Sequence, residues 1–223
     1  MAHDLSGLEF TVGKTDALSD GEWEKVRGLF ETSYRQANLA YLERSLEKLH
    51  YVARAHHGGS LAGFALGKTR VMDLPRLPAQ VVSLAGICCI VPEFRRYGLW
   101  GELMRVTLAA GEVSEAPRRL VCGRMAHPAA MRIMTGHPTV VPKPGTRPTR
   151  WQQEVGQVVA EAYAVHAFDP ETFVCIGDGE PIGYPNIEIE VEPLEWEIFK
   201  PVNRDRGDSL LGIIWGPDAP PGW

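Results

Sequence analysis

Residues 81–111 constrain the fold of this chain more than any other segment. They read VVSLAGICCIVPEFRRYGLWGELMRVTLAAG, and their apolar, β-branched beginning is typical of a buried strand. Pro92 interrupts this run, and a basic turn follows at Arg95-Arg96-Tyr97-Gly98. From Leu99 the apolar residues keep a helical spacing until Gly111, so the segment predicts a strand, a tight turn and a helix.

A glycine turn between a strand and a helix is suited to binding an anion. The first N–H groups of a helix have no carbonyl partner within the helix, and the helix dipole favours negative charge at that end. Arg95 and Arg96 add positive charge to the same turn. A pyrophosphate is the ligand that this arrangement favours, while an ordinary corner with solvated arginines stays the alternative interpretation.

At these residues the sequence resembles the GNAT acyltransferase superfamily. The pattern of that family is a strand, then V-x-P-x-x-R/Q-x-x-G-x-G/A, then a helix, and residues 90–100 follow it up to the last position, where Trp100 replaces Gly or Ala. The resemblance covers about residues 8–142 and implies an acyl-coenzyme A site at the turn. The residues that it places beside the donor are Cys89, Ile90, Val91, Arg95, Arg96, Tyr97, Gly98, Leu99, Trp100 and Gly101.

The pattern before the turn agrees with the element order of that family, β-α-α-β-β-β-α. A strand is expected at Leu8–Val12, and helices are expected after the capping box that starts at Ser19 and after Asn38. The turn at residues 56–59 predicts a hairpin, and a loop with Pro75 and Pro78 is expected before the long strand that begins at Val81. The expected fold class is α+β: an α/β/α sandwich with a mixed, mainly antiparallel sheet flanked by helices.

The last third of the chain predicts a C-terminal α/β extension. Residues 1–148 are interpreted as a GNAT-like, acyl-CoA-binding core, and residues 149–223 as a helix and strands packed on the same domain. Alternating apolar and acidic residues at 187–192 predict a strand with one solvated face. Residues 210–215 predict a final strand.

The general acid and the general base are the uncertain part of the resemblance. Many members of the family carry a glutamate on the fourth strand, but residues 81–91 contain no carboxylate. The acid of the family is commonly a tyrosine, and Met134 stands in its place. The candidate catalytic residues are therefore His127 or Glu93, acting through water, and Cys89 as a nucleophile. For His127 a helix cap, and for Cys89 simple packing, are the competing interpretations.

Composition excludes several function classes. The net charge of −5 and the lack of basic runs argue against nucleic-acid binding. Neither a secretory signal nor an apolar run of the ~20 residues that span a bilayer is recognised, so a cytoplasmic protein without a membrane partner is expected. The four cysteines suggest reduced, buried thiols, and the histidines show no metal-ligand spacing, so no metal is expected.

Three functions fit these observations. The leading one is an enzyme, a GNAT-type N-acyltransferase that moves an acetyl or other acyl group from acyl-CoA, its co-substrate, directly to the amine of a small molecule. In the second, acyl carrier protein is the donor. The third is a GNAT-fold protein without transfer, either a ligand-binding pseudoenzyme or an acyl-thioester decarboxylase. A second copy of the chain, in a homodimer, is a further candidate partner. The acceptor and the acyl chain are not readable from the sequence.

Overall fold

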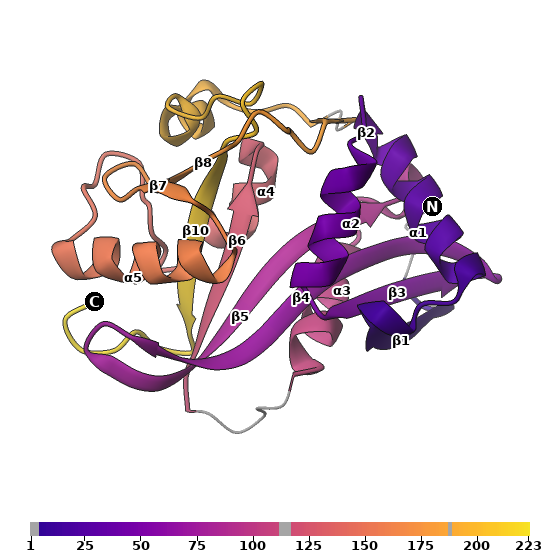
Figure 1. Ribbon diagram of the computed structural model, residues 1–223, viewed down its shortest axis with the longest axis horizontal. Coiled ribbons are helices and arrows are strands. Elements are labelled where there is room, and N and C mark those ends of the chain that lie inside the picture. Colours follow the sequence, from indigo (N-terminus) through magenta and orange to yellow (C-terminus); the bar gives the residue numbers. More distant parts are fainter. Residues whose placement is uncertain (1–4, 112–116, 187–188) are drawn as a thin grey trace. The chain divides into compact units, whose positions relative to one another are not determined.

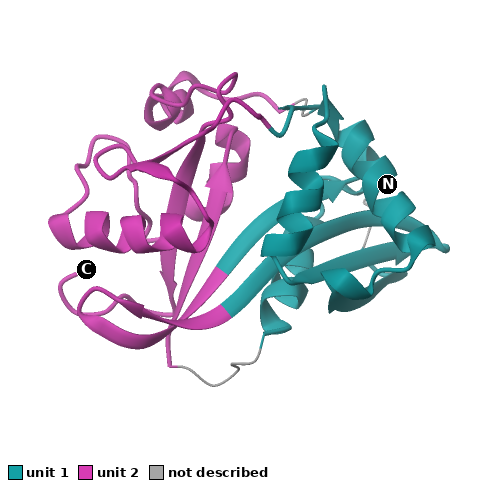
Figure 2. Cartoon of the chain, viewed as in Figure 1, with its two compact units in different colours: residues 1–69, 84–114, 182–187 teal, residues 70–83, 115–181, 188–223 magenta. Residues whose placement is uncertain are grey.

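The computed structural model describes residues 5–111, 117–186 and 189–223 of the chain. The described residues form two compact units (Figure 2). Unit 1 comprises residues 1–69, 84–114 and 182–187, and unit 2 comprises residues 70–83, 115–181 and 188–223. The units thus interleave along the sequence, whereas the predicted boundary at residue 148 is a single division and stays a prediction.

Unit 1 is built on antiparallel strands. Strand β1 (Leu8–Lys14) pairs with β3 (Tyr51–His57), and β3 pairs with β4 (Ser60–Leu74), which lies next to β5 (Leu77–Ile90). Helices α1 (Asp20–Ser33) and α2 (Leu39–Lys48) lie on one face of these strands and α3 (Leu99–Ala109) on the other (Figure 1). The short strands β2 (Tyr34–Arg35) and β9 (Tyr184–Pro185) form a separate antiparallel pair. The mixed α/β architecture with a mainly antiparallel sheet is the predicted fold class.

Local capping explains where the first two helices begin. The Glu22 carboxylate accepts hydrogen bonds from the N–H of Ser19 at 2.9 Å and from its hydroxyl at 2.7 Å. These bonds, together with Arg54, lower the pKa of Glu22 to about 2. The Asn38 side chain accepts from the N–H of Tyr41 at 3.1 Å. Both predicted helix starts are confirmed, because α1 begins directly after Ser19 and α2 directly after Asn38.

The loop predicted around Pro75 and Pro78 is wrong. Strand β4 continues to Leu74 and β5 begins at Leu77, so only Pro75 and Arg76 connect them. Arg76 has a φ of 67°, which is the left-handed conformation that a tight hairpin turn requires. The strand that was expected from Val81 is therefore longer at its start, and Pro78 lies inside it.

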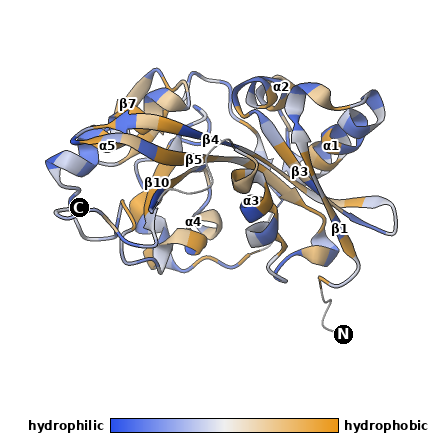
Figure 3. Ribbon diagram, turned by 90° about the horizontal axis from the view of Figure 1, so that it is seen from below, coloured by the Kyte–Doolittle hydropathy of each residue, from blue (hydrophilic) through white to orange (hydrophobic). Residues whose placement is uncertain are grey.

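Close packing of α3 on the strands forms the core of unit 1. A Cβ atom on Gly67 would lie 2.8 Å from the Thr107 side chain and 2.9 Å from that of Leu108, so this position has no room for one. Small residues on the strands let the helix approach, and Figure 3 shows the hydrophobic stretches of β4 and β5. The buried cluster consists of Ala53, Ala55, Ala62, Ala65, Ala85, Leu99, Leu103 and Met104.

Unit 2 contains the remaining strands and two helices. From β5 the strand order continues through β6 (Arg119–Met125), β10 (Ser209–Gly216), β8 (Val174–Ile176) and β7 (Ala167–Asp169). Helices α4 (Pro128–Thr135) and α5 (Arg150–Ala162) lie on opposite faces of these strands (Figures 1 and 3). The predicted final strand is confirmed by β10, whose pairing with β6 includes Trp215 opposite Leu120.

The strand predicted at residues 187–192 is not observed at residues 189–192. Residues 187 and 188 lie outside the described residues, and residues 189–192 have no strand structure. A 3-10 helix, Pro193–Phe199, follows them directly. The Arg132 guanidinium on α4 donates to the backbone oxygen of Glu190 at 2.6 Å, so this segment makes a side-chain contact in place of a ladder.

No helix in the described part of the chain is both long enough and apolar enough to cross a membrane.

Candidate functional site

The turn between β5 and α3 has the backbone shape of an anion site. After β5 ends at Ile90, a short 3-10 helix, Pro92–Phe94, leads into the turn. Arg96 has a φ of 69° and Gly98 a φ of 84°, so two residues of the turn are left-handed. Turns that include left-handed residues direct successive N–H groups toward one point, which is how backbone binds phosphate groups.

The start of α3 leaves its first N–H groups without a carbonyl partner in the helix. The Glu102 N–H is the first to reach back, to the carbonyl of Gly98 at 3.3 Å. Gly98 is the N-cap residue and has no side chain to cover the N–H groups of the first turn. Leu99 is buried while Gly98 and Gly101 are exposed, so the core holds the helix start and the turn faces solvent.

The two arginines of the turn differ in their surroundings. The guanidinium of Arg95 donates from Nε to the Ile90 carbonyl at 2.9 Å and from Nη1 to the Asn186 carbonyl at 3.0 Å. Arg96 is exposed, as is its neighbour Tyr97. The expectation that both arginines add charge to the turn stays a prediction.

Trp100 packs on the protein and does not project freely. Its side chain is partly buried against the alanine- and leucine-rich cluster of unit 1, together with Phe94 and Ile90. The indole thus occupies the position where the GNAT pattern has Gly or Ala, and it packs against the core of unit 1.

The predicted donor residues Cys89 and Ile90 end β5, and Val91 directly follows it. The Val91 N–H donates to the Ala62 carbonyl at 3.0 Å, so it is already engaged within the sheet. Cys89 is buried, and desolvation raises the pKa of its thiol to about 12, although the Ser33 side chain acts in the opposite direction. A thiolate at Cys89 is therefore strongly disfavoured near neutral pH, which argues against covalent catalysis.

We predict that the Cys89 thiol reacts slowly with alkylating reagents in the folded protein, since its side chain is buried. Burial raises the pKa of Cys88 and Cys122 well above its usual range and that of Cys175 to about 11. At pH 8 a pKa of about 12 leaves roughly one Cys89 thiol in ten thousand ionised. Iodoacetamide labelling mapped by mass spectrometry is expected to modify all four cysteines in guanidinium chloride and to modify Cys89 very slowly without it. Rapid native labelling of Cys89 would contradict the described environment.

Tyr34 is a polar group that the sequence reasoning missed. It directly follows the last residue of α1 and begins β2, and the centroid of its ring lies 5.0 Å from that of Phe30. Burial, followed by the nearby Cys89, Tyr41 and Cys88, raises the pKa of Tyr34 well above its usual value. Like any tyrosine hydroxyl at neutral pH, that of Tyr34 carries a proton that it can donate in a hydrogen bond.

His127 belongs to unit 2, whereas the turn, Cys89 and Glu93 belong to unit 1. The His127 ring accepts from the Ala129 N–H at 3.2 Å and so caps α4. It also makes an edge contact with Trp196 at 5.5 Å between ring centroids. Burial lowers the pKa of His127, with smaller contributions from nearby arginines, so the ring is neutral at pH 7.

Glu93 and Met134 are two further residues that the sequence pattern singled out. Glu93 is exposed in the 3-10 helix before the turn, where its carboxylate faces solvent. Met134 is buried on α4 and its sulfur lies where a Cβ on Gly212 of β10 would need space, so it is a packing residue. The described residues include no group of three or more His, Cys, Asp or Glu side chains that could hold a metal ion.

Comparison with known proteins gives distant structural likeness only. No protein-family description and no curated protein matches the sequence. A putative acetyltransferase from Deinococcus radiodurans R1 is 16% identical over 69% of this chain and 95% of its own, with a TM-score of 0.39. A GNAT family acetyltransferase from Brucella melitensis, in complex with acetyl-CoA, is 15% identical over 51% of this chain and 75% of its own, with a TM-score of 0.35. An aminoglycoside N-acetyltransferase in complex with CoA is 19% identical over 49% and 81%, with a TM-score of 0.32. At these scores the likeness carries no functional argument, which has to come from the residues of the chain itself.

Proposed function

We propose that this chain is a GNAT-type acyltransferase that moves an acyl group from acyl-CoA directly to the amine of a small molecule. The observation that carries the proposal is the turn at residues 95–101. There the left-handed Gly98 precedes a helix whose first N–H groups have no carbonyl partner within α3. The motif that resembles the GNAT pattern thus has the backbone geometry that binding a diphosphate requires.

The turn supports the donor side of the reaction. The N–H groups of Leu99, Trp100 and Gly101 bind the diphosphate, and Arg96 adds charge from the exposed side of the turn. The end of β5, at Cys89 and Ile90, lies next along the chain and lines the thioester part of the donor. An acyl-CoA bound in this way supplies an activated carbonyl, and the protein supplies orientation and electrostatic stabilisation.

Proton transfer is the step for which the chain offers fewest groups. Strand β5 has no carboxylate, Met134 cannot donate a proton, and the His127 nitrogen that faces α4 is used as a helix cap. Tyr34 is a protonated hydroxyl near Cys88 and Cys89, and Glu93 is a solvated carboxylate before the turn. We leave deprotonation of the amine to water and to Glu93, and we assign no side chain as the general acid.

Buried Met134 in place of an acid favours a second candidate, a GNAT-fold protein that binds a thioester without transferring its acyl group. A third candidate uses acyl carrier protein as the donor, and Trp100 at the position of a small residue is the observation in its favour. Both candidates keep the phosphate-binding turn, since a carrier protein also presents a phosphopantetheine group. They differ from the leading proposal in whether free acyl-CoA is turned over.

Isothermal titration with acetyl-CoA and desulfo-coenzyme A tests the donor site. Gly98→Val is expected to weaken binding about tenfold or more, because a β-branched residue at a φ of 84° strains the turn. Gly28→Ala on α1 is the matched control, since a Cβ there meets no atom within 4 Å. Its affinity is expected to equal that of the unmodified protein.

The outcomes separate the three candidates. Binding of both ligands, lost on Gly98→Val, together with acetylation of a screened amine, supports the leading proposal. Binding without turnover over an amine panel supports the non-transferring protein. If the unmodified protein binds neither ligand at millimolar concentration but is active with acyl carrier protein, the donor is acyl carrier protein and not acyl-CoA. Equal affinity of Gly98→Val and Gly28→Ala would overturn the assignment of the turn.

A further inference from the structure

The side chain of Arg95 connects two parts of unit 1 that are far apart in sequence. Its Nε donates to the carbonyl of Ile90, at the end of β5, and its Nη1 donates to the carbonyl of Asn186, directly after β9. The first distance is 2.9 Å and the second is 3.0 Å. One guanidinium therefore spans from the strand before the turn to a segment 91 residues away.

The first of these contacts sets the orientation of the peptide that leads into the turn. The oxygen of the Ile90–Val91 peptide accepts from Arg95, and its N–H, on Val91, donates to the Ala62 carbonyl of β4 at 3.0 Å. Both polar ends of this peptide are thus engaged. The chain leaves β5 in one direction as long as the Arg95 contact is present.

The second contact continues to the end of α1 through Asn186. The Asn186 N–H donates to the Ser33 carbonyl at 2.8 Å, and its side-chain amide donates to the Thr32 carbonyl at 3.1 Å. The last carbonyls of a helix have no donors within the helix, so Asn186 caps the C-terminus of α1. Beside it, Tyr34 of β2 is in register with Pro185 of β9.

We infer that Arg95 is a positioning residue, which fixes the donor turn to the C-terminus of α1 through Asn186, and that it is not a ligand of the donor phosphates. Its planar fork suits this role, because two of its nitrogens can donate to two carbonyls at the same time. Those two nitrogens are then unavailable to a phosphate. The inference rests on the proposed function only where it calls the turn a donor site, since the hydrogen bonds belong to the ligand-free protein.

Through Asn186, this role also reaches the start of β2. Tyr34 lies between Ser33, whose carbonyl Asn186 contacts, and Arg35 on β2. Loss of the Arg95 contact is therefore expected to disturb the position of Tyr34 as well as that of the turn. A residue that only bound phosphate would affect donor binding alone.

Lysine substitution separates the two roles, because lysine keeps the positive charge and loses the fork. The experiment compares Arg95→Lys with Arg96→Lys, the same change at the next position of the turn. Amide hydrogen exchange measured by NMR on the ligand-free proteins reports the Asn186 N–H. The amide of Phe10, in the β1–β3 ladder, is the internal reference for opening of the whole unit. Titration with coenzyme A reports donor affinity.

Arg95→Lys is expected to raise exchange at Asn186 about tenfold or more and to leave Phe10 unchanged, because it removes charge-assisted hydrogen bonds to two carbonyls. Arg96→Lys is expected to change neither amide. The two variants Arg95→Lys and Arg95→Ala are expected to lower the affinity for coenzyme A to the same extent.

Two results would overturn the inference. One is unchanged exchange at Asn186 in Arg95→Lys with near-normal coenzyme A affinity, which is the behaviour of a charge that faces phosphate. The other is an equal rise in the exchange rates of Asn186 and Phe10, which would mean that Arg95 stabilises the whole unit. In that case Arg95→Gln, which keeps one donor group, repeats the comparison with a smaller disturbance. If coenzyme A binds to none of the proteins, the proposed function fails, while the exchange data still decide the role of Arg95.

Discussion

Replacing Trp215 with alanine is expected to lower the free energy of unfolding by about 3–5 kcal/mol. Trp215 is fully buried, at 0% exposure, on β10, with β6 beside it. Its indole meets that of Trp223 edge-on, with 5.7 Å between the ring centroids, and Trp223 in turn meets Trp151 of α5 at 5.6 Å. Alanine would leave a cavity beside Trp223, which the rigid rings can fill only in part.

Chemical denaturation followed by circular dichroism measures this loss. Trp215→Phe is the matched variant, and it is expected to cost about 1–2 kcal/mol. It leaves a smaller cavity and also removes the indole N–H of Trp215, which has no acceptor among the described residues. Leu194→Ala, at a side chain that is 69% exposed, is the surface control and is expected to change stability by less than about 0.5 kcal/mol. A cost below about 1 kcal/mol for Trp215→Ala would contradict the packing of unit 2.

Local signals made much of unit 1 predictable. The Ser19–Glu22 capping box and Asn38 each specify a helix start from a few neighbouring residues. Pro92 and Gly98 specify the end of β5 and the start of α3 in the same way. Each signal depends on hydrogen bonds or backbone angles within about four residues, so the sequence alone contains the whole argument.

The β4–β5 hairpin shows why a strong local signal can mislead. Two prolines within four residues are typical of a loop, but Pro75 supplies half of a two-residue turn and Pro78 lies within β5. The left-handed residue of this turn is Arg76, where Gly or Asn would have been the recognisable choice. Pairing over a long hairpin outweighs the unfavourable residues, and only the assembled sheet reveals that balance.

The candidate site also has a part that local sequence signals predict and a part that they do not. The turn itself was predictable, because its glycine and its helix start are local. The partner of Arg95 was not, since Asn186 is 91 residues away and its contact is a backbone carbonyl that no side-chain pattern marks. Tyr34 was missed for a related reason: helical spacing identified the face of α1 but not the thiols of Cys88 and Cys89 near it.

These differences bear on the chemistry. Sequence comparison with the GNAT pattern directs attention to α4, where Met134 and His127 offer a packing residue and a cap. In unit 1, Arg95 of the turn contacts Asn186, which in turn contacts the carbonyls of Thr32 and Ser33 directly before Tyr34.

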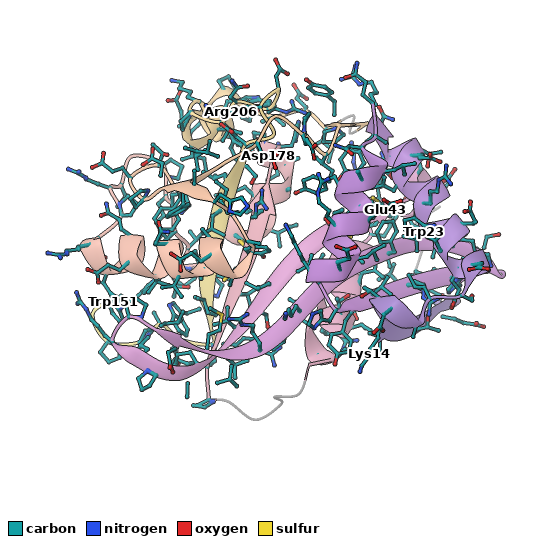
Figure 4. All side chains as sticks on the ribbon, viewed as in Figure 1. Lys14, Trp23, Glu43, Trp151, Asp178 and Arg206 are labelled. Atoms are coloured by element: carbon teal, nitrogen blue, oxygen red, sulfur yellow. The ribbon has the colours of Figure 1, made fainter. Side chains whose placement is uncertain are left out.

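Replacing Gly177 with alanine is expected to cost about 3 kcal/mol, because backbone atoms already occupy the space that a methyl group needs. A Cβ at this position would overlap the Arg206 carbonyl oxygen and lie 2.5 Å from the Gly207 carbonyl carbon. Figure 4 labels Arg206 and Asp178, which mark the two loops that meet here. Backbone in contact with backbone cannot yield as the end of a flexible side chain can.

The same substitution would strain a buried carboxylate. The Gly177 N–H donates to Asp208 Oδ1 at 2.8 Å, and Asp208, only 1% exposed, also accepts from the Asn203 N–H at 3.0 Å and from the Arg206 guanidinium at 2.6 Å. These bonds lower the pKa of Asp208 against the effect of its burial. Separating the loops would leave a buried charge with fewer donors, which adds to the steric cost.

Gly179→Ala is the matched control for this prediction. Gly179 lies two residues away in the same turn, its φ is 89°, and a Cβ there meets no atom within 4 Å. The control therefore carries the conformational penalty of a left-handed alanine, about 1 kcal/mol, without the overlap. Equilibrium unfolding in urea is expected to rank Gly177→Ala well below Gly179→Ala in stability. If the order is reversed, the contact between residues 177–179 and 203–208 is not as close as described, and Asp208 is held mainly by Arg206.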